Sequence, residues 1–388
     1  MREVYFDYGA TTPPRPEVVE AMLPYFREHF GNPQSLHRYG DAPRQAVEGA
    51  REKVAGLIGA RGNEIYFTAS GSEANNFAIK GVALMNRQRG EHVVVSSVEH
   101  LSVINAARTL EKLGLEVTLV PVDRYGLVDP ADVVKALRED TTLVSVMHAN
   151  SEIGTIQPIA EIAGAVKERS KAYFHTDAVA TTGRIPVDVR ELGVDLLSLA
   201  ADQFYGPKGA GALYIKRATR IMPLVDGGIQ EAGRRAGTEN VPGIVGLGVA
   251  AEMAAQDMEE RRAHVVPLRD ALIEHLTRDI EKVHLTGHPT ERLPGHVSVV
   301  VEFIEGEAML LLLNMQGVAA SSGSTCTSRA LKASHVLTAI GLEPGLANGS
   351  LLLTLGMGNS MEDVDHFREV FPPIVKRLRE MSPLYKEA

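Results

Sequence analysis

Short apolar runs alternate with helix-like stretches through the first two thirds of the chain, and this alternation limits the fold more than any other feature. Each run covers about four to six residues, the length of a buried strand. The expected strands lie at residues 64–68, 92–95, 116–120, 143–147, 173–175, 195–198 and 211–215, with helices expected at 71–86 and 100–113. Such a pattern is typical of a mostly parallel sheet, whose sites lie at the carboxyl ends of the strands.

The pattern changes after about residue 255. A charged helix is expected to begin at Glu259 and to run between two domains. Beyond it we expect strands at 296–303, 318–320 and 350–355, and helices at 307–315, 329–340 and 361–381. The sequence therefore predicts an α/β fold with a large domain over residues 15–255. A smaller α+β domain would comprise residues 1–14 and 256–388 and would carry Cys326.

Length and charge exclude several classes of protein. A chain of 388 residues is long enough for two domains. It carries 40 basic and 49 acidic residues, a net charge of −9, which disfavours binding to nucleic acid or to an anionic membrane surface. The longest aliphatic run, residues 308–313, is far shorter than the roughly 20 residues of a membrane span. No targeting segment is visible, so we expect a cytoplasmic protein with neither nucleic-acid nor membrane partners.

Small polar residues follow the first strand of the series, at the point where a helix begins. Backbone amides at Gly71 and the hydroxyl of Ser72 would face an anion at the helix N-terminus, as in a phosphate site. The alternative is an ordinary helix cap with Ser72 as the capping residue. His100 and Asp177 also follow strands, and each alone is more often a cap or a buried polar residue. Together, these residues predict a pocket with an anion cradle, a flat ring partner and a buried acid.

Cys326 is the only cysteine of the chain. A single cysteine excludes an internal disulfide and a metal cage built from the chain's own thiolates. Residues 321–328 are small and polar without apolar periodicity, so this segment is expected to form a loop. A structural cysteine usually lies among apolar neighbours. The surroundings of Cys326 instead favour a reactive nucleophile or a metal ligand, with an incidental cysteine as the alternative.

Many segments of the chain resemble the cysteine desulfurases of the NifS/IscS type. They include HTDA at 175–178, YGPKG at 205–209 and RAGTEN at 235–240, together with residues 5–12, 30–33, 35–37, 67–68, 99–100 and 150–154. These segments cover essentially the whole chain. The family consists of pyridoxal-phosphate enzymes that supply sulfur for iron–sulfur clusters. The resemblance implies an aspartate-aminotransferase-type fold and a homodimer with two active sites.

The resemblance assigns cofactor-binding roles by position. Gly71 and Ser72 would hold the phosphate of the cofactor. Thr238 would reach the phosphate in the site of the partner subunit. Asn150, in the motif at residues 150–154, would belong to the same cofactor site.

Three further positions carry the chemistry that the resemblance implies. His100 would stack on the pyridine ring. Asp177 would pair with the ring nitrogen and keep it protonated, which makes the ring an electron sink. Cys326 would accept sulfur from L-cysteine as a persulfide.

The site also departs from the family pattern. The family reads Ser-x-His-Lys before the YGPKG turn, and its lysine forms the Schiff base, whereas this chain reads AADQ at residues 200–203. Gln203 has no amine nucleophile, and the carboxylate of Asp202 would repel a phosphate. Further departures are Ala180, Ser151, Leu352 and Met357, where the family has a glutamine, an asparagine and two arginines.

These departures lead to a main functional hypothesis. We predict a desulfurase-family protein of iron–sulfur cluster assembly that docks a scaffold protein of the IscU type. Cys326 would carry sulfur or ligate the iron of a shared [2Fe-2S] cluster. Because Gln203 replaces the lysine, L-cysteine desulfurase activity would be impaired or lost, and pyridoxal phosphate would bind weakly and without a covalent bond.

Two alternatives to this hypothesis stay open. The first is an active pyridoxal-phosphate-dependent cysteine desulfurase that forms a persulfide on Cys326. The second is a decayed paralogue that has only a structural role.

Overall fold

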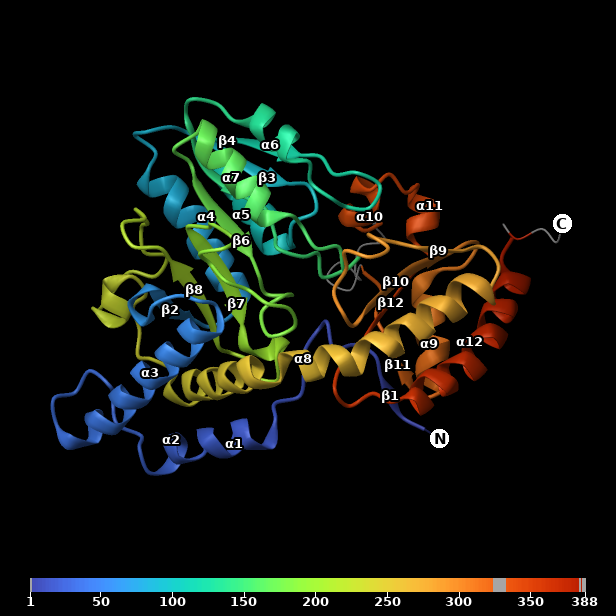
Figure 1. The fold of residues 1–388 in the computed structure, drawn as a ribbon, viewed down its shortest axis with the longest axis horizontal. Coiled ribbons are helices and arrows are strands. Elements are labelled where there is room, and N and C mark those ends of the chain that lie inside the picture. The colour runs from blue at the N-terminus through green and yellow to red at the C-terminus, as the bar shows by residue number, and fades with distance from the viewer. Residues whose placement is uncertain (1, 324–332, 384, 386–388) are drawn as a thin grey trace.

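The computed structural model describes residues 2–323, 333–383 and 385, so Cys326 lies outside the described residues. At its centre is a seven-stranded sheet with the strand order β2-β8-β7-β6-β5-β3-β4 (Figure 1). The strands are β2 (Ile65–Thr68), β3 (His92–Ser96), β4 (Glu116–Val120), β5 (Thr141–Ser145), β6 (Tyr173–Asp177), β7 (Leu196–Ala200) and β8 (Gly211–Ile215). Strands β4, β3, β5, β6 and β7 are parallel, and β8 is antiparallel to both neighbours. The predicted α/β fold with a mostly parallel sheet is confirmed.

Helices cover both faces of this sheet. Val94 of β3 lies in one apolar core and its neighbours Val93 and Val95 lie in another, because side chains alternate across a strand. The first core is covered by α1 (Pro16–Met22), α3 (Arg38–Leu57), α6 (Pro130–Ala136), α7 (Ile159–Arg169) and the first half of α8 (Val241–Arg278). The second is covered by α4 (Gly71–Met85) and α5 (Leu101–Lys112). Parallel strands buried on both faces explain the continuous apolar runs of the sequence.

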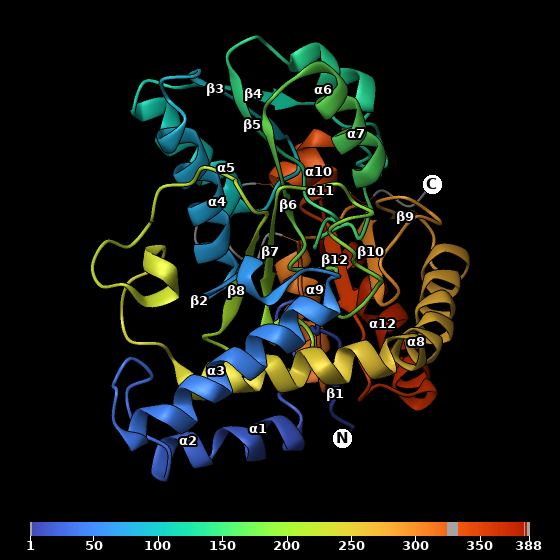
Figure 2. The same ribbon diagram turned by 60° about the vertical axis from the view of Figure 1, so that its left-hand side comes forward.

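Helix α8 runs from the large sheet to the C-terminal part of the chain (Figure 1). The helix predicted to begin at Glu259 therefore begins at Val241, after the capping residue Asn240. Its first half packs against α1 and α3 (Figure 2), so it is apolar on more than one side and lacks a simple amphipathic period. The predicted domain boundary at residue 255 falls inside this helix, and the domain limits stay a prediction.

The C-terminal part contains two small sheets. One has the antiparallel order β12-β10-β9, and the other pairs β1 with β11 in parallel. Their strands are β1 (Val4–Tyr5), β9 (Val283–Leu285), β10 (His296–Val301), β11 (Val318–Ala319) and β12 (Ser350–Thr354). A separate apolar core joins them to the second half of α8, to α9 (Gly306–Met315) and to α12 (Met361–Met381). Through β1, the start of the chain lies beside its C-terminal third.

Short elements complete the fold. They are α2 (Pro24–Arg27), α10 (His335–Ala339) and α11 (Pro344–Ala347), with 3₁₀ turns η1 (Gly62–Glu64), η2 (Ala201–Gln203) and η3 (Gln230–Gly233). Helix α10 begins six residues later than the predicted start at Arg329, and part of that interval lies outside the described residues. In the part of the chain that is described, no helix combines the length and apolarity needed to cross a membrane.

Candidate active site

The turn between β2 and α4 lies at one end of the large sheet. Ser70 caps α4, since its hydroxyl accepts a 3.1 Å hydrogen bond from the amide of Glu73. The alternative in which Ser72 is the capping residue is therefore wrong. Ser72 is instead the exposed second residue of the helix. At this position its hydroxyl and backbone amide lie at the helix N-terminus, where anions are favoured.

Gly71 lies where the ends of β2, β6 and β7 come together. A Cβ placed on Gly71 would lie 2.5 Å from Cγ2 of Val179 and 3.6 Å from Cβ of Ala200. Val179 follows β6, and Ala200 ends β7. Only a glycine fits this approach without displacing Val179. The predicted anion cradle is thus a narrow turn. The side chain that faces it from β7 is the methyl group of Ala200.

A chain of hydrogen bonds connects Asp177 with His100. The side-chain nitrogen Nδ2 of Asn75 lies 2.6 Å from Oδ2 of Asp177 and 2.8 Å from Oγ of Ser102. Oγ of Ser102 lies 2.7 Å from Nδ1 of His100. The structure therefore brings Asp177 and His100 into one site, with Asn75 and Ser102 between them.

Hydrogen bonds from backbone amides hold both ends of this series, Asp177 and His100, in place. Asp177 is the last residue of β6, and its Oδ1 accepts a 2.9 Å hydrogen bond from the amide of Val179. His100 caps α5 by accepting a hydrogen bond from the amide of Ser102 at Nδ1. Nδ1 is therefore an acceptor, which puts the ring proton of a neutral His100 on Nε2.

Buried acids dominate the electrostatics of the site. Burial raises the pKa of Asp177, and the nearby His100, the amide of Val179 and Asn75 oppose this shift. Burial also raises the pKa of Glu99 to about 8, against the hydrogen bond from Ser96. With a pKa of about 8, Glu99 is mainly neutral at neutral pH.

Gln203 is the residue that the resemblance aligns with the family lysine. It is buried in η2, and its Oε1 accepts a 3.0 Å hydrogen bond from Arg184. Its Nε2 donates to the carbonyl oxygen of Ala10 at 3.3 Å. Both polar atoms of the amide are thus paired with the chain itself. Lys208 is exposed in the following turn, in keeping with a role in that turn.

The residues present fit pyridoxal phosphate. Oδ1 of Asn75, beside Asp177, is buried and accepts no hydrogen bond from any residue that the structure describes, so it is an acceptor at this end of the site that a cofactor could use. The exposed N-terminus of α4 at Ser72 suits a phosphate. Gln203 does not fit a covalent link, because an amide forms no imine.

The remaining predicted site residues are separate from this chain of hydrogen bonds. Asn150 is buried, with Oδ1 accepting from the amides of Glu152 and Ile153 and Nδ2 donating to the carbonyl of Val98. Its side chain therefore stabilises its own turn, and a contact with the cofactor stays a prediction. Thr238 is exposed in the loop before α8, and its contact with a partner subunit also stays a prediction.

Cys326 was predicted both as the reactive thiol and as a metal ligand, and it lies outside the described residues. Among the residues that are described, no group of three His, Asp or Glu side chains is arranged to hold a metal ion. Leu352, which the resemblance aligns with a family arginine, is buried in β12 and exchanges two backbone hydrogen bonds with Ser321. The apolar side chain of Leu352 therefore lies close in the fold to the start of the Cys326 segment.

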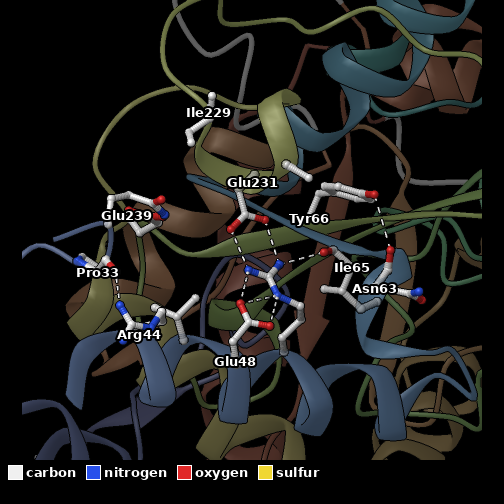
Figure 3. Close-up of a pocket in the computed structure, with 13 residues that line it drawn as sticks. Pro33, Arg44, Glu48, Asn63, Ile65, Tyr66, Ile229, Glu231 and Glu239 are labelled. Carbon is white, nitrogen blue, oxygen red and sulfur yellow. Dashed lines mark hydrogen bonds and ion pairs between the residues drawn. The ribbon is translucent and has the colours of Figure 1, made fainter. Parts of the chain in front are cut away.

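A separate cavity of about 350 Å³ lies between α3 and the residues around η3 (Figure 3). Arg51 crosses it and bonds both carboxylate oxygens of Glu231, at 2.8 and 2.9 Å. None of the described site residues lines this cavity, although Glu239, next to Thr238 in sequence, does. The cavity is therefore distinct from the predicted site.

Sequence reasoning missed three residues that organise the site. Asn75 lies four residues after Gly71, one helical turn away, so helical spacing could have identified it. Ser102 and Arg184 bear no comparable signal. Their partners His100 and Gln203 become evident only in the folded chain.

Comparisons with known proteins show which family the chain belongs to. The cysteine desulfurase IscS of Methanosarcina thermophila is 54% identical over 383 residues, which cover 99% of this chain and 94% of that protein. Cysteine desulfurase IscS 1 of Archaeoglobus fulgidus is 50% identical over 382 residues, 98% of this chain and 99% of that protein. A solved NifS-like protein has a TM-score of 0.91 at 37% identity and covers 97% of this chain and 100% of its own. The sequence model of the aminotransferase class-V family matches residues 4–367, and the chain belongs to that family.

Proposed function

We propose that the chain is a pyridoxal-phosphate-dependent cysteine desulfurase that supplies sulfur for iron–sulfur clusters through a persulfide on Cys326. The names of relatives about half identical over nearly its whole length support this proposal. These names favour the active enzyme over the enzyme with impaired activity that Gln203 suggests. The observation that carries the proposal is the hydrogen-bonded chain from Asp177 to His100 beside the Gly71 turn.

The residues of this series of hydrogen bonds, and those of the Gly71 turn beside it, would each have a role toward the cofactor. Gly71 and Ser72 would bind the phosphate at the N-terminus of α4. Asp177 would hold a proton on the ring nitrogen, and Asn75 would orient that carboxylate. When bound, pyridoxal phosphate withdraws electrons from the substrate carbon next to its amino group. His100 would lie against the ring, with its orientation fixed by Ser102.

A second candidate function is favoured by Gln203 and Leu352. Gln203 is a buried amide bonded to Arg184, and Leu352 cannot bind a carboxylate. With both family contacts replaced, desulfurase activity would be impaired or lost. Cys326 would then carry sulfur, or ligate a [2Fe-2S] cluster shared with an IscU-type scaffold protein. A homodimer and this scaffold partner belong to both candidates.

Sulfide release from L-cysteine separates the two candidates. The purified protein is assayed with added pyridoxal phosphate and a thiol reductant, with Cys326→Ala as the matched variant. An active desulfurase releases sulfide in the presence of the reductant and, without the reductant, gains the mass of one sulfur atom on Cys326, and Cys326→Ala does neither. If the wild-type protein releases no more sulfide than free pyridoxal phosphate, the first candidate is wrong.

The second candidate is tested by anaerobic copurification with a scaffold protein in the presence of iron and sulfide. A shared cluster predicts that the Cys326→Ala variant yields less cluster with a changed visible spectrum. An unchanged yield and spectrum would exclude Cys326 as a ligand.

A further inference from the structure

A second, smaller cavity of about 40 Å³ lies where helix α8 passes the η2 turn. Arg261 and Arg262 of α8 line it together with Arg184 and with Gln203 of η2. We call it the arginine cavity. The residues expected to hold the cofactor do not line it, so it is distinct from the candidate active site.

The side chains around the arginine cavity carry an excess of positive charge. Three of them are arginines, and no Asp or Glu is among the described residues that line it. Neutral side chains such as Val265 and Leu355 complete the wall. Because charges interact more strongly where water is displaced by apolar groups, such a cavity favours an anion.

Arg261 is the most unusual of the three arginines, because only 6% of its surface is exposed. Its Nε lies 2.6 Å from Oδ1 of Asp257, and its guanidinium lies over the ring of Tyr205, 4.9 Å from the ring centre. The other oxygen of Asp257 is 2.8 Å from Nη1 of Arg15. Asp257 therefore shares its charge between two arginines and contacts Arg261 at one end only.

The far end of the Arg261 guanidinium has no acceptor. Both Nη1 and Nη2 are buried and donate no hydrogen bond to any residue that the structure describes. Burial lowers the pKa of Arg261, and Asp257 opposes that shift, but a guanidinium keeps its charge at neutral pH. Buried charged donors without acceptors are rare in folded proteins and cost free energy. The arginine cavity therefore lacks an acceptor that a ligand could supply.

The size of the cavity limits that ligand. One water needs roughly 10–15 Å³ of such space, so the cavity holds about three or four waters or an anion of similar size. The two Nη groups of an arginine form a planar fork that matches two oxygens of a carboxylate or a phosphate. Waters alone would satisfy the donors but would leave the positive charge without a counterion.

We propose that the arginine cavity binds a small oxyanion of about four or five non-hydrogen atoms, with Nη1 and Nη2 of Arg261 as its main donors. Arg184 and Arg262 add positive charge around it. Inorganic phosphate, sulfate and a small carboxylate such as acetate share the required chemistry. The site goes beyond the proposed function and does not depend on it.

Calorimetric titration with sodium phosphate and with sodium acetate tests this site in the purified protein, at neutral pH and at an ionic strength held constant with sodium chloride. We expect at least one of the two anions to bind with a Kd of about 1 mM or below. Tighter binding of phosphate would identify an inorganic oxyanion as the ligand, and tighter binding of acetate would identify a carboxylate. If neither anion binds in excess over chloride, the proposal is wrong.

Three arginine variants assign the binding to the cavity. Arg261→Met should weaken it about tenfold or more, because it removes the fork. Arg262→Gln should weaken it about threefold, and since Arg262 is largely exposed, this variant keeps the test decisive if Arg261→Met does not fold. Arg269→Met is the matched control, because Arg269 lies on the same helix, pairs with Asp270 and does not line the cavity. It should bind within about twofold of wild type.

The N-terminus of α4 could also bind phosphate, so the two places must be told apart. Ser72→Ala should leave binding at the arginine cavity unchanged. In crystals soaked with selenate, we expect an anomalous peak within hydrogen-bond distance of the Arg261 guanidinium. A peak at Ser72 alone, or an affinity that Ser72→Ala lowers and the Arg261 and Arg262 variants do not, would overturn the proposal. These readouts need neither cofactor nor L-cysteine, so a failure of the proposed function leaves them intact.

Discussion

Arg184 donates a 3.0 Å hydrogen bond to the side-chain oxygen of Gln203, the residue that the resemblance to the desulfurases aligns with their lysine. The same nitrogen of Arg184 lies 2.7 Å from the carbonyl oxygen of Tyr8, and Gln203 in turn donates to the carbonyl of Ala10. The neutral amide of Gln203 thus provides one of the hydrogen-bond acceptors of the buried guanidinium of Arg184. A lysine at position 203 could not do this, because it has no acceptor and repels a guanidinium.

Replacing Gln203 by lysine should destabilise the protein even though it restores the family residue. Gln203→Lys removes an acceptor from Arg184 and adds a second buried positive charge beside it. We expect a loss of about 1–3 kcal/mol in the free energy of unfolding, measured by urea denaturation without cofactor. Lys208→Gln changes an exposed lysine in the following turn and should have little effect. Equal stability of Gln203→Lys and wild type would contradict the role assigned to the amide.

Asp177 should control the affinity for pyridoxal phosphate. Asp177→Asn keeps the shape but cannot stabilise a protonated ring nitrogen, so we expect affinity to fall about tenfold or more, measured by absorbance titration. Asp195→Asn is the matched control. Asp195 is also buried, but it precedes β7 and so lies at the opposite end of the strands from Asp177. An equal effect of the two substitutions would show that Asp177 does not contact the cofactor.

Gly71 should tolerate no side chain. Gly71→Ala brings a methyl group against the stiff, branched side chain of Val179, and we expect a cost of about 1–3 kcal/mol in unfolding free energy. Gly49 offers a control within α3, because a Cβ there meets no atom within 4 Å. Gly49→Ala should stabilise by up to about 1 kcal/mol through helix propensity. Thermal unfolding of both variants checks the opposite signs, and a loss of stability in both would argue against a specific contact at Gly71.

Glu99 should make the protein less stable as pH rises. Its pKa is raised from 4.5 to about 8 in the folded protein, so folding takes up a proton. This stabilisation is complete below about pH 4.5 and is lost as pH rises to about 8. Relative to Glu99→Gln, wild type should therefore lose stability across this range, by at most about 5 kcal/mol. Parallel stability curves for the two proteins in urea would show that Glu99 does not change its charge there.

Local patterns made part of the fold predictable. Helix α12 was predicted at its observed limits, Met361–Met381, because its apolar period is strong and its first turn carries an acidic capping box after Ser360. The start of α8 was missed because its first half is buried by α1 and α3 on more than one side. The hydrophobic period of this first half therefore does not indicate a surface helix.

The candidate site was predictable only where single residues mark it. Asp177 and His100 were identified because each follows a strand at the carboxyl edge of the sheet. The hydrogen bond from Asn75 to Asp177 joins residues 102 positions apart, and that from Arg184 to Gln203 depends on how the η2 turn folds. Such pairings arise from packing in three dimensions, so no sequence period records them.

We expect pyridoxal phosphate to bind at Gly71, Ser72, His100 and Asp177, and Gln203 to leave it without a covalent link to the chain. The most direct measurement is borohydride reduction of the protein saturated with pyridoxal phosphate, followed by dialysis and mass spectrometry of the intact chain. We predict a cofactor absorbance before reduction, its loss on dialysis, and an unchanged chain mass. A stoichiometric mass increase of one reduced cofactor on a single lysine would contradict the account.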